Sequence, residues 1–122
     1  MDYHRAIARY YQAYRDRDRQ TLRSLLTASF HFVSSFAEYR GRDAMLEEIW
    51  PAVGQAWATK LRIFGHGPEL VVLYEHENAP GEKRPGMSMA EYIRFEGDRI
   101  AEIEVFQGRP IVSEASEEEC DD

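Results

Sequence analysis

Apolar residues in the first half of the chain recur with the spacing of amphipathic helices. The first set occupies positions i, i+3, i+4 and i+7 and predicts a helix over about residues 2–17; it consists of Ile7, Tyr10, Tyr11 and Tyr14. Asp18 is a candidate N-cap for a short second helix, whose apolar residues are Leu22, Leu25 and Leu26. Gly41 precedes a third apolar pattern, made of Met45, Leu46, Ile49, Trp50, Val53 and Trp57. Because proline disrupts a helix interior, Pro51 predicts a kink or a restart in this third helix.

The remaining apolar segments are typical of β-strands. Residues 30–33 alternate between aromatic and other side chains, as a half-buried strand does. Four further strands are predicted over residues 60–65, 69–77, 87–95 and 99–107, with turn signals rich in glycine between them. Three helices followed by a mostly antiparallel sheet make an α+β domain. We expect the helices to close one face of a curved sheet, with a pocket between the layers.

The negative charge of the chain is concentrated at its C-terminal end. The formal net charge is −7, and residues 113–122 contain six acidic residues and no basic residue. Without this segment the chain has 16 acids and 15 bases, a net charge of −1. We therefore predict a single domain over residues 1–112 and an acidic, disordered tail over residues 113–122.

This charge balance and the residue usage limit the partners that we expect. A nearly neutral domain attracts neither a nucleic-acid backbone nor an anionic membrane, and no apolar stretch reaches the length of a membrane span. Cys120 is the only cysteine, which favours a reducing compartment, and the charged N-terminus does not resemble a signal peptide, so we expect a cytoplasmic protein. The four histidines lack metal-ligand spacing, and we expect neither a metal nor a cofactor.

Three segments together resemble one fold family. They are RYYQAYRDRD over residues 9–18, YRGRDAML over residues 39–46, and AEYIRFEGDRIAEIEVFQG over residues 90–108. Their order and spacing resemble the NTF2-like superfamily, specifically its SnoaL-like and ketosteroid-isomerase-like members, over about residues 9–107. The resemblance implies an NTF2-like cone, in which three N-terminal helices pack on a curved sheet that encloses a pocket.

The resemblance also implies candidate catalytic residues. Ketosteroid isomerases use a tyrosine of the first helix and a strand acid as an oxyanion hole, and an aspartate at the end of the first strand as the base. These positions correspond here to Tyr10, Glu91 and Ser34. A serine cannot take a carbon-bound proton without an activating base, so we do not expect isomerase activity. Burial would raise the pKa of Glu91 and keep it protonated, and His76 is a further candidate base.

The side of the sheet on which Glu91 lies depends on the hairpin around Gly97. A two-residue loop would place Glu91 opposite Glu104, on a solvated or subunit surface. A three-residue loop would place it opposite Ile103, among apolar residues. Because like charges rarely face each other, we favour the three-residue loop, in which Glu91 is a pocket acid next to Tyr10.

Two functions are consistent with these patterns. The first is a pocket protein, either a binding protein or an enzyme, for a small apolar, polyketide-like or steroid-like molecule; its predicted ligand-binding residues are Tyr14, Phe30, Phe32, Trp50, Met89, Ile103 and Val105. The second is a non-catalytic dimeric binding or scaffold module, in which side chains fill the cavity. Both predict a homodimer through the exposed face of the sheet. An open cavity of hundreds of cubic ångströms would favour the first.

Overall fold

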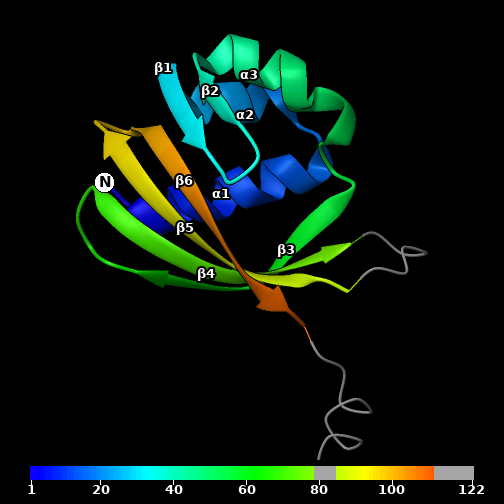
Figure 1. Cartoon of the computed structure of the whole chain (residues 1–122). Helices are drawn as coiled ribbons and strands as arrows, with labels where there is room; N and C mark the ends of the chain where they lie inside the picture. Colours follow the sequence, from blue (N-terminus) through cyan, green and yellow to red (C-terminus); the bar gives the residue numbers. More distant parts are fainter. Residues whose placement is uncertain (79–84, 112–122) are drawn as a thin grey trace, which may run out of the picture.

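Three α-helices and one six-stranded sheet form the described part of the chain, which comprises residues 1–78 and 85–111 of a computed structural model (Figure 1). The helical segments are α1 (Tyr3–Asp16), α2 (Arg19–Leu25), α3 (Arg42–Ile49) and the short 3-10 helix η1 (Trp50–Ala52). The strands are β1 (Leu26–Val33), β2 (Glu38–Arg40), β3 (Ala56–Phe64), β4 (Glu69–Asn78), β5 (Met87–Glu96) and β6 (Arg99–Pro110). The predicted α+β class is confirmed. The predicted acidic tail, residues 113–122, lies outside the described residues.

The helix ends follow from local side-chain chemistry. The carboxylate of Asp2 accepts a hydrogen bond from the backbone N–H of Arg5 and begins α1. Asp18 caps α2 in the same way through the N–H of Thr21, as the sequence predicts. Pro51 ends α3, and the chain continues as η1, which confirms the predicted restart.

The third predicted helix is nevertheless shorter than its apolar pattern. Trp57 lies in β3 rather than on the helix, so this part of the prediction is wrong. The cause is the turn after η1, where Gly54 has a φ of +84°, a left-handed conformation that glycine adopts readily.

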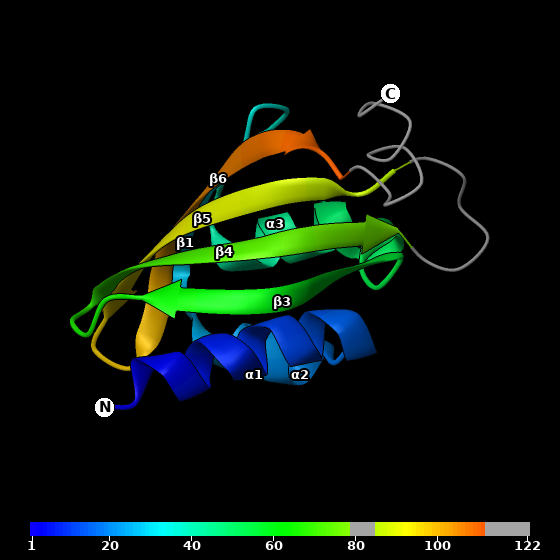
Figure 2. The same ribbon diagram turned by 90° about the horizontal axis from the view of Figure 1, so that it is seen from below.

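The sheet order is β2-β1-β6-β5-β4-β3, and every neighbouring pair is antiparallel except β1 and β6, which run parallel. Figure 1 shows the sheet bending round α1, with α3 lying against β1 and β2. Figure 2 shows from below that α1 and α2 lie on one side of the strands, with α1 running along β3. The helices therefore cover the inner face of the sheet and leave its outer face uncovered.

The β5–β6 hairpin differs from both predicted registers. Glu96 pairs with Arg99, so the loop contains two residues and the predicted three-residue loop is wrong. The register then shifts by one, because Phe95 pairs with Ile100 and Arg94 with Glu102, which leaves Ala101 as a β-bulge. Beyond the bulge Glu91 lies opposite Val105, rather than Glu104 or Ile103.

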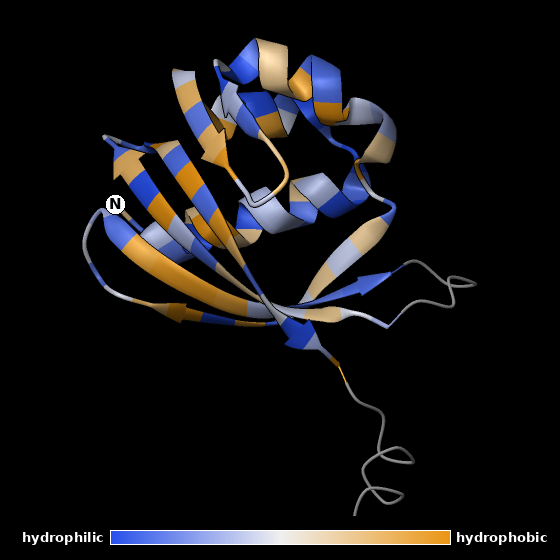
Figure 3. Ribbon diagram, viewed as in Figure 1, coloured by the Kyte–Doolittle hydropathy of each residue, from blue (hydrophilic) through white to orange (hydrophobic). Residues whose placement is uncertain are grey.

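The inner face of the sheet and the apolar faces of the helices form one core. Figure 3 shows hydrophobic and hydrophilic residues alternating along β5 and β6, as in a sheet with one buried face. The fully buried side chains of this core include Ile7, Leu22, Phe30, Leu46 and Ile103. No helix among the described residues is long and apolar enough to cross a membrane.

Candidate ligand-binding pocket

A cavity of about 320 Å³ lies between α1 and the inner face of the sheet. Its walls come from α1, from β1 and the loop that follows it, and from the four strands β3 to β6. Aromatic side chains make up much of this wall; they are Tyr10, Tyr11, Tyr14, Phe32, Phe36, Trp57 and Tyr74. The cavity is therefore open and mostly apolar, as ligand pockets commonly are.

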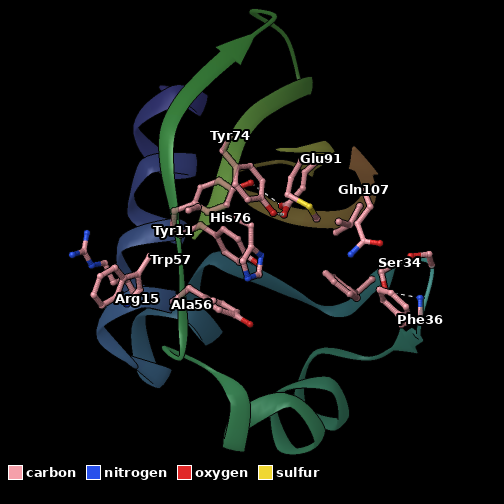
Figure 4. A pocket seen from close by; sticks show the side chains of 17 residues that line it. Tyr11, Arg15, Ser34, Phe36, Ala56, Trp57, Tyr74, His76, Glu91 and Gln107 are labelled. Atoms are coloured by element: carbon pink, nitrogen blue, oxygen red, sulfur yellow. Dashed lines mark hydrogen bonds between the residues drawn. The ribbon is translucent and has the colours of Figure 1, made fainter. Parts of the chain in front are cut away.

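Glu91 is the acidic residue in the wall of this cavity, and two tyrosines hold its carboxyl group (Figure 4). The hydroxyl of Tyr11 donates a hydrogen bond to Oε1 over 2.7 Å, and the hydroxyl of Tyr74 donates to Oε2. Tyr11 reaches Glu91 from α1, whereas Tyr74 lies on β4, which pairs with β5. Helix and sheet packing therefore brings together three polar groups that are far apart in the sequence. We call this set the Tyr11–Tyr74–Glu91 cluster.

Burial dominates the protonation of the cluster. Glu91 is only 6% exposed, and loss of water raises the pKa of its carboxyl group above the ordinary value, although the two tyrosine hydrogen bonds act in the opposite direction. The pKa of Tyr11 rises well above its ordinary value, first because of burial and then because of the nearby carboxylate. The same two causes raise the pKa of Tyr74. At neutral pH both tyrosines therefore keep their protons and act as donors.

Tyr10 occupies a different place from the one expected of it. It is buried and lines the cavity, but the tyrosine of α1 that bonds to Glu91 is Tyr11. Successive residues of a helix point about 100° apart, so Tyr10 and Tyr11 face different directions and only one of them can reach Glu91. The two rings meet edge to face with their centroids 5.2 Å apart, and Tyr10 supports the orientation of Tyr11.

Ser34 also lines the cavity, and the loop after β1 engages its side chain. The hydroxyl oxygen accepts hydrogen bonds from the backbone N–H groups of Phe36 and Ala37, each over 3.2 Å. The side chain therefore stabilises the turn that leads to β2. No histidine or carboxylate among the described residues contacts Ser34 to activate it as a base.

His76 is a half-buried histidine in the wall, two residues beyond Tyr74 on the same face of β4. Its ring makes no hydrogen bond or ion pair within residues 1–78 and 85–111. Burial lowers the pKa of the imidazole, which is therefore neutral at pH 7 and can accept a proton from the cavity.

The predicted ligand-binding residues divide into two groups. Four of them line the cavity: Tyr14, Phe32, Met89 and Val105. Phe30 and Ile103 do not, because both are fully buried in the core behind the wall. Trp50 also lies elsewhere, in η1, where the guanidinium groups of Arg17 and Arg19 lie 5.0 and 5.2 Å from its ring centroid.

The sequence did not predict several residues of the cavity wall, because the packing of α1 against the strands places them there. Tyr11 belonged to the predicted apolar face of the first helix but was given no role. Tyr74 continues the buried row of Leu70 and Val72 along β4, and its hydrogen-bond partner could not be identified without the strand pairing. Trp57 lines the cavity because it lies on β3, and the guanidinium carbon of Arg15 lies 4.4 Å from its ring centroid.

The described residues contain no group of three or more histidine, cysteine, aspartate or glutamate side chains that could hold a metal ion. The polar groups in the wall are the hydroxyls of its tyrosines and serines, the carboxyl group of Glu91, the imidazole of His76, the guanidinium of Arg15 and the amide of Gln107.

Comparisons with known proteins place this geometry in a family. The family model of the SnoaL-like domain matches residues 7–103. None of the curated protein sequences compared with the chain matches it.

Solved structures share the fold at low sequence identity. An epoxide hydrolase of M. tuberculosis, described as LEH-like, is 17% identical, with 85% of this chain and 80% of that chain covered and a TM-score of 0.73. A protein of Kribbella flavida that is provisionally named a ketosteroid isomerase is 13% identical, with coverage of 88% and 78% and a TM-score of 0.74. An NTF2-like protein of unknown function from Burkholderia pseudomallei is 16% identical, with coverage of 85% and 88% and a TM-score of 0.74.

These structural likenesses concern the fold alone, which is the predicted NTF2-like cone. The family match spans most of the chain, including the helix that carries Tyr11 and the strands that carry Tyr74 and Glu91. The chain belongs to the SnoaL-like domain family, and its fold is NTF2-like.

Proposed function

We propose that this protein binds a small, mostly apolar molecule in its cavity and orients one polar group of that molecule at the Tyr11–Tyr74–Glu91 cluster. The observation that carries this proposal is an open cavity of about 320 Å³, lined mainly by aromatic and aliphatic side chains with one buried polar cluster. Ligand pockets commonly combine such a volume with an apolar wall and a few convergent polar groups. A polyketide-like or steroid-like skeleton is compatible with this wall.

The candidate residues have distinct roles in this proposal. Glu91 and its two tyrosines bind the polar group, and Tyr10 supports Tyr11 from inside α1. Ser34 contributes to the wall rather than acting as a base, because its hydroxyl group is engaged in the turn. If the protein transforms its ligand, His76 is the group available to move a proton.

The scaffold alternative requires that side chains fill the cavity. Met45 is buried in the core and Trp50 lies outside the wall, so neither occupies this space. Tyr14 lines the space and leaves it open. These positions favour the ligand-binding function.

A homodimer through the outer face of the sheet is part of the proposal. The exposed apolar residues of this face are Phe64, Val71 and Phe106, at 49%, 39% and 51% exposure. A second copy of the chain would cover them.

Binding of a neutral aromatic probe tests the proposed function. In a Trp50→Phe variant the remaining tryptophan, Trp57, lies in the wall, so its fluorescence should report saturable binding of 3-tert-butylanisole. Ala58→Phe places a ring in the cavity and should abolish the response, whereas Ala52→Phe, on the exposed surface of η1, should leave it unchanged. If no saturable response occurs, or if Ala58→Phe leaves it intact, the cavity does not bind ligands as proposed.

A further inference from the structure

Glu91 is a buried carboxyl group without a cationic partner in the part of the chain that the structure describes. Its hydrogen bonds come from the uncharged hydroxyls of Tyr11 and Tyr74. Buried glutamates are rare unless they are paired, because transfer of a carboxylate out of water costs several kcal/mol. This carboxyl group must therefore either remain protonated or receive a positive charge from outside the chain.

The two basic residues in the cavity wall do not supply that charge. Arg15 forms no ion pair with Glu91, and its guanidinium group lies over the ring of Trp57 instead. Figure 4 shows Arg15 next to Trp57, on the opposite side of the view from Glu91. His76 is held neutral by burial. The position of the missing cation is thus open to the ligand.

The surroundings of Glu91 suit a cation for a second reason. Aromatic rings from α1, β1 and β4 line the same cavity, among them Tyr10, Tyr11, Phe32 and Tyr74. The faces of such rings attract cations, and aromatic cages are a common way to bind quaternary ammonium groups. In addition, the two tyrosine hydroxyls donate to Glu91, which leaves their oxygen lone pairs available to accept a hydrogen bond from the N–H of a tertiary ammonium group.

We infer that the polar group of the ligand is an organic cation, a tertiary or quaternary ammonium group carried on a small apolar skeleton, with Glu91 as its counter-ion and the aromatic wall as its cage. This inference rests on the proposed function and names the group that the cavity recognises. A carbonyl or hydroxyl group would use the protonated form of Glu91, whereas the cation uses the ionised form.

The two forms of Glu91 make cation binding depend on pH. The titratable and charged groups that share the cavity with Glu91 are Tyr10, Tyr11, Tyr14 and Arg15 of α1 and Tyr74 and His76 of β4. In the free protein, burial raises the pKa of Glu91 and favours a bound proton. A cation must displace that proton, so its affinity should increase as the pH rises through the pKa of Glu91, and binding below that pKa should release a proton.

Two compounds of the same shape, one charged and one neutral, separate the contribution of the positive charge to binding from that of the apolar skeleton. The compounds are 3-methoxyphenyltrimethylammonium and 3-tert-butylanisole, which differ in one atom, a positively charged nitrogen in place of a carbon, and neither of which ionises between pH 5 and pH 8. At pH 8 we expect the wild-type protein to bind the cation about tenfold more tightly than the neutral compound. The ratio of the two affinities should fall toward pH 5, and calorimetry there in two buffers of different ionisation enthalpy should detect the released proton.

Substitutions of Glu91 and Tyr11 test whether the Tyr11–Tyr74–Glu91 cluster produces the preference for the cation. Glu91→Gln should remove most of the tenfold preference, whereas the matched control Glu104→Gln, which removes one negative charge from the neighbouring strand outside the cavity wall, should retain it. Tyr11→Phe gives a second variant of the cluster, in which the preference should fall but keep its pH dependence.

The possible results distinguish the two proposals. If the neutral compound binds as tightly as the cation at pH 8, or if Glu91→Gln retains the preference, the cation inference is wrong while the proposed function stands. If neither compound binds the wild-type protein, both proposals are wrong. The pH dependence is measured on the wild-type protein and does not require that Glu91→Gln folds.

Discussion

Replacement of Glu91 by glutamine should stabilise the domain, and increasingly so as the pH rises. The folded state holds the pKa of Glu91 above the ordinary value of 4.5 that the unfolded chain should show. Between these two pKa values the folded protein binds more protons than the unfolded chain, so its free energy of unfolding falls with rising pH. Each unit of upward displacement costs about 1.4 kcal/mol once the carboxyl group is ionised. Glutamine does not titrate, so the variant should not show this fall in the free energy of unfolding as the pH rises.

The size of the effect follows from two opposing contributions. Removal of a carboxylate from water costs several kcal/mol, and each hydrogen bond to a charged group stabilises the folded state by about 1.5–3 kcal/mol. Glu91 accepts two such bonds, from Tyr11 and Tyr74, and the raised pKa indicates that they do not offset the full cost. We therefore expect Glu91→Gln to gain on the order of 1–3 kcal/mol relative to the wild-type protein between pH 5 and pH 8.5.

Urea unfolding followed by tryptophan fluorescence at several pH values measures this difference. Glu104→Gln is the matched control, because it removes an acid of the neighbouring strand that does not line the cavity, and its effect should be small at every pH. A Glu91→Gln effect that is independent of pH would show that Glu91 has the same pKa in both states. A loss of stability at pH 8.5 would show that the ionised carboxylate is favoured by its surroundings.

Three further predictions concern the rest of the chain. Light scattering at micromolar concentration should give about twice the chain mass of 14.2 kDa, and Phe106→Glu on the outer face should give the monomer; a wild-type monomer would contradict the dimer. Truncation after Val112 should change the melting temperature by no more than a few degrees, because the removed acidic residues have little apolar area to bury. His31 lies 2.6 Å from Glu38 and 3.0 Å from Glu102, which raise its pKa. Stability from this pair of contacts is present below pH 6.5 and is lost as the pH rises through the folded pKa, so His31→Gln should cost more at pH 6 than at pH 9, by less than about 1 kcal/mol; equal costs at both pH values would contradict it.

Elements with a regular apolar period could be predicted from the sequence. The helix over residues 2–17 and the cap at Asp18 agree with α1 and the start of α2 to within about a residue. The order of helices and strands then indicated the family. These features depend on local chemistry, which the sequence states directly.

The contacts around Glu91 could not be predicted in the same way. Tyr11 rather than Tyr10 meets the acid, because the rotation of α1 against the sheet depends on packing that involves three separate elements. Tyr74 reaches Glu91 only through the pairing of β4 with β5. The bulge at Ala101 had a local signal, since Ile100 and Ile103 are both apolar at a spacing of three, which interrupts a strict alternation.

The inward-facing residues of β5 show on which face of the sheet Glu91 lies. Met89, Glu91, Ile93 and Phe95 alternate with outward residues, and all four are buried. The apolar neighbours fix the face on which Glu91 lies, whatever the loop length. An aliphatic residue at this position would pack in the same row without the cost of a buried carboxyl group. Glu91 lies in the wall of an open cavity and receives two tyrosine hydroxyls, and the proposed ligand binding explains such a residue better than packing does. The same reasoning links the stability of Glu91→Gln to the cation preference, since the proton that stabilises the empty cavity is the one that a cation must displace.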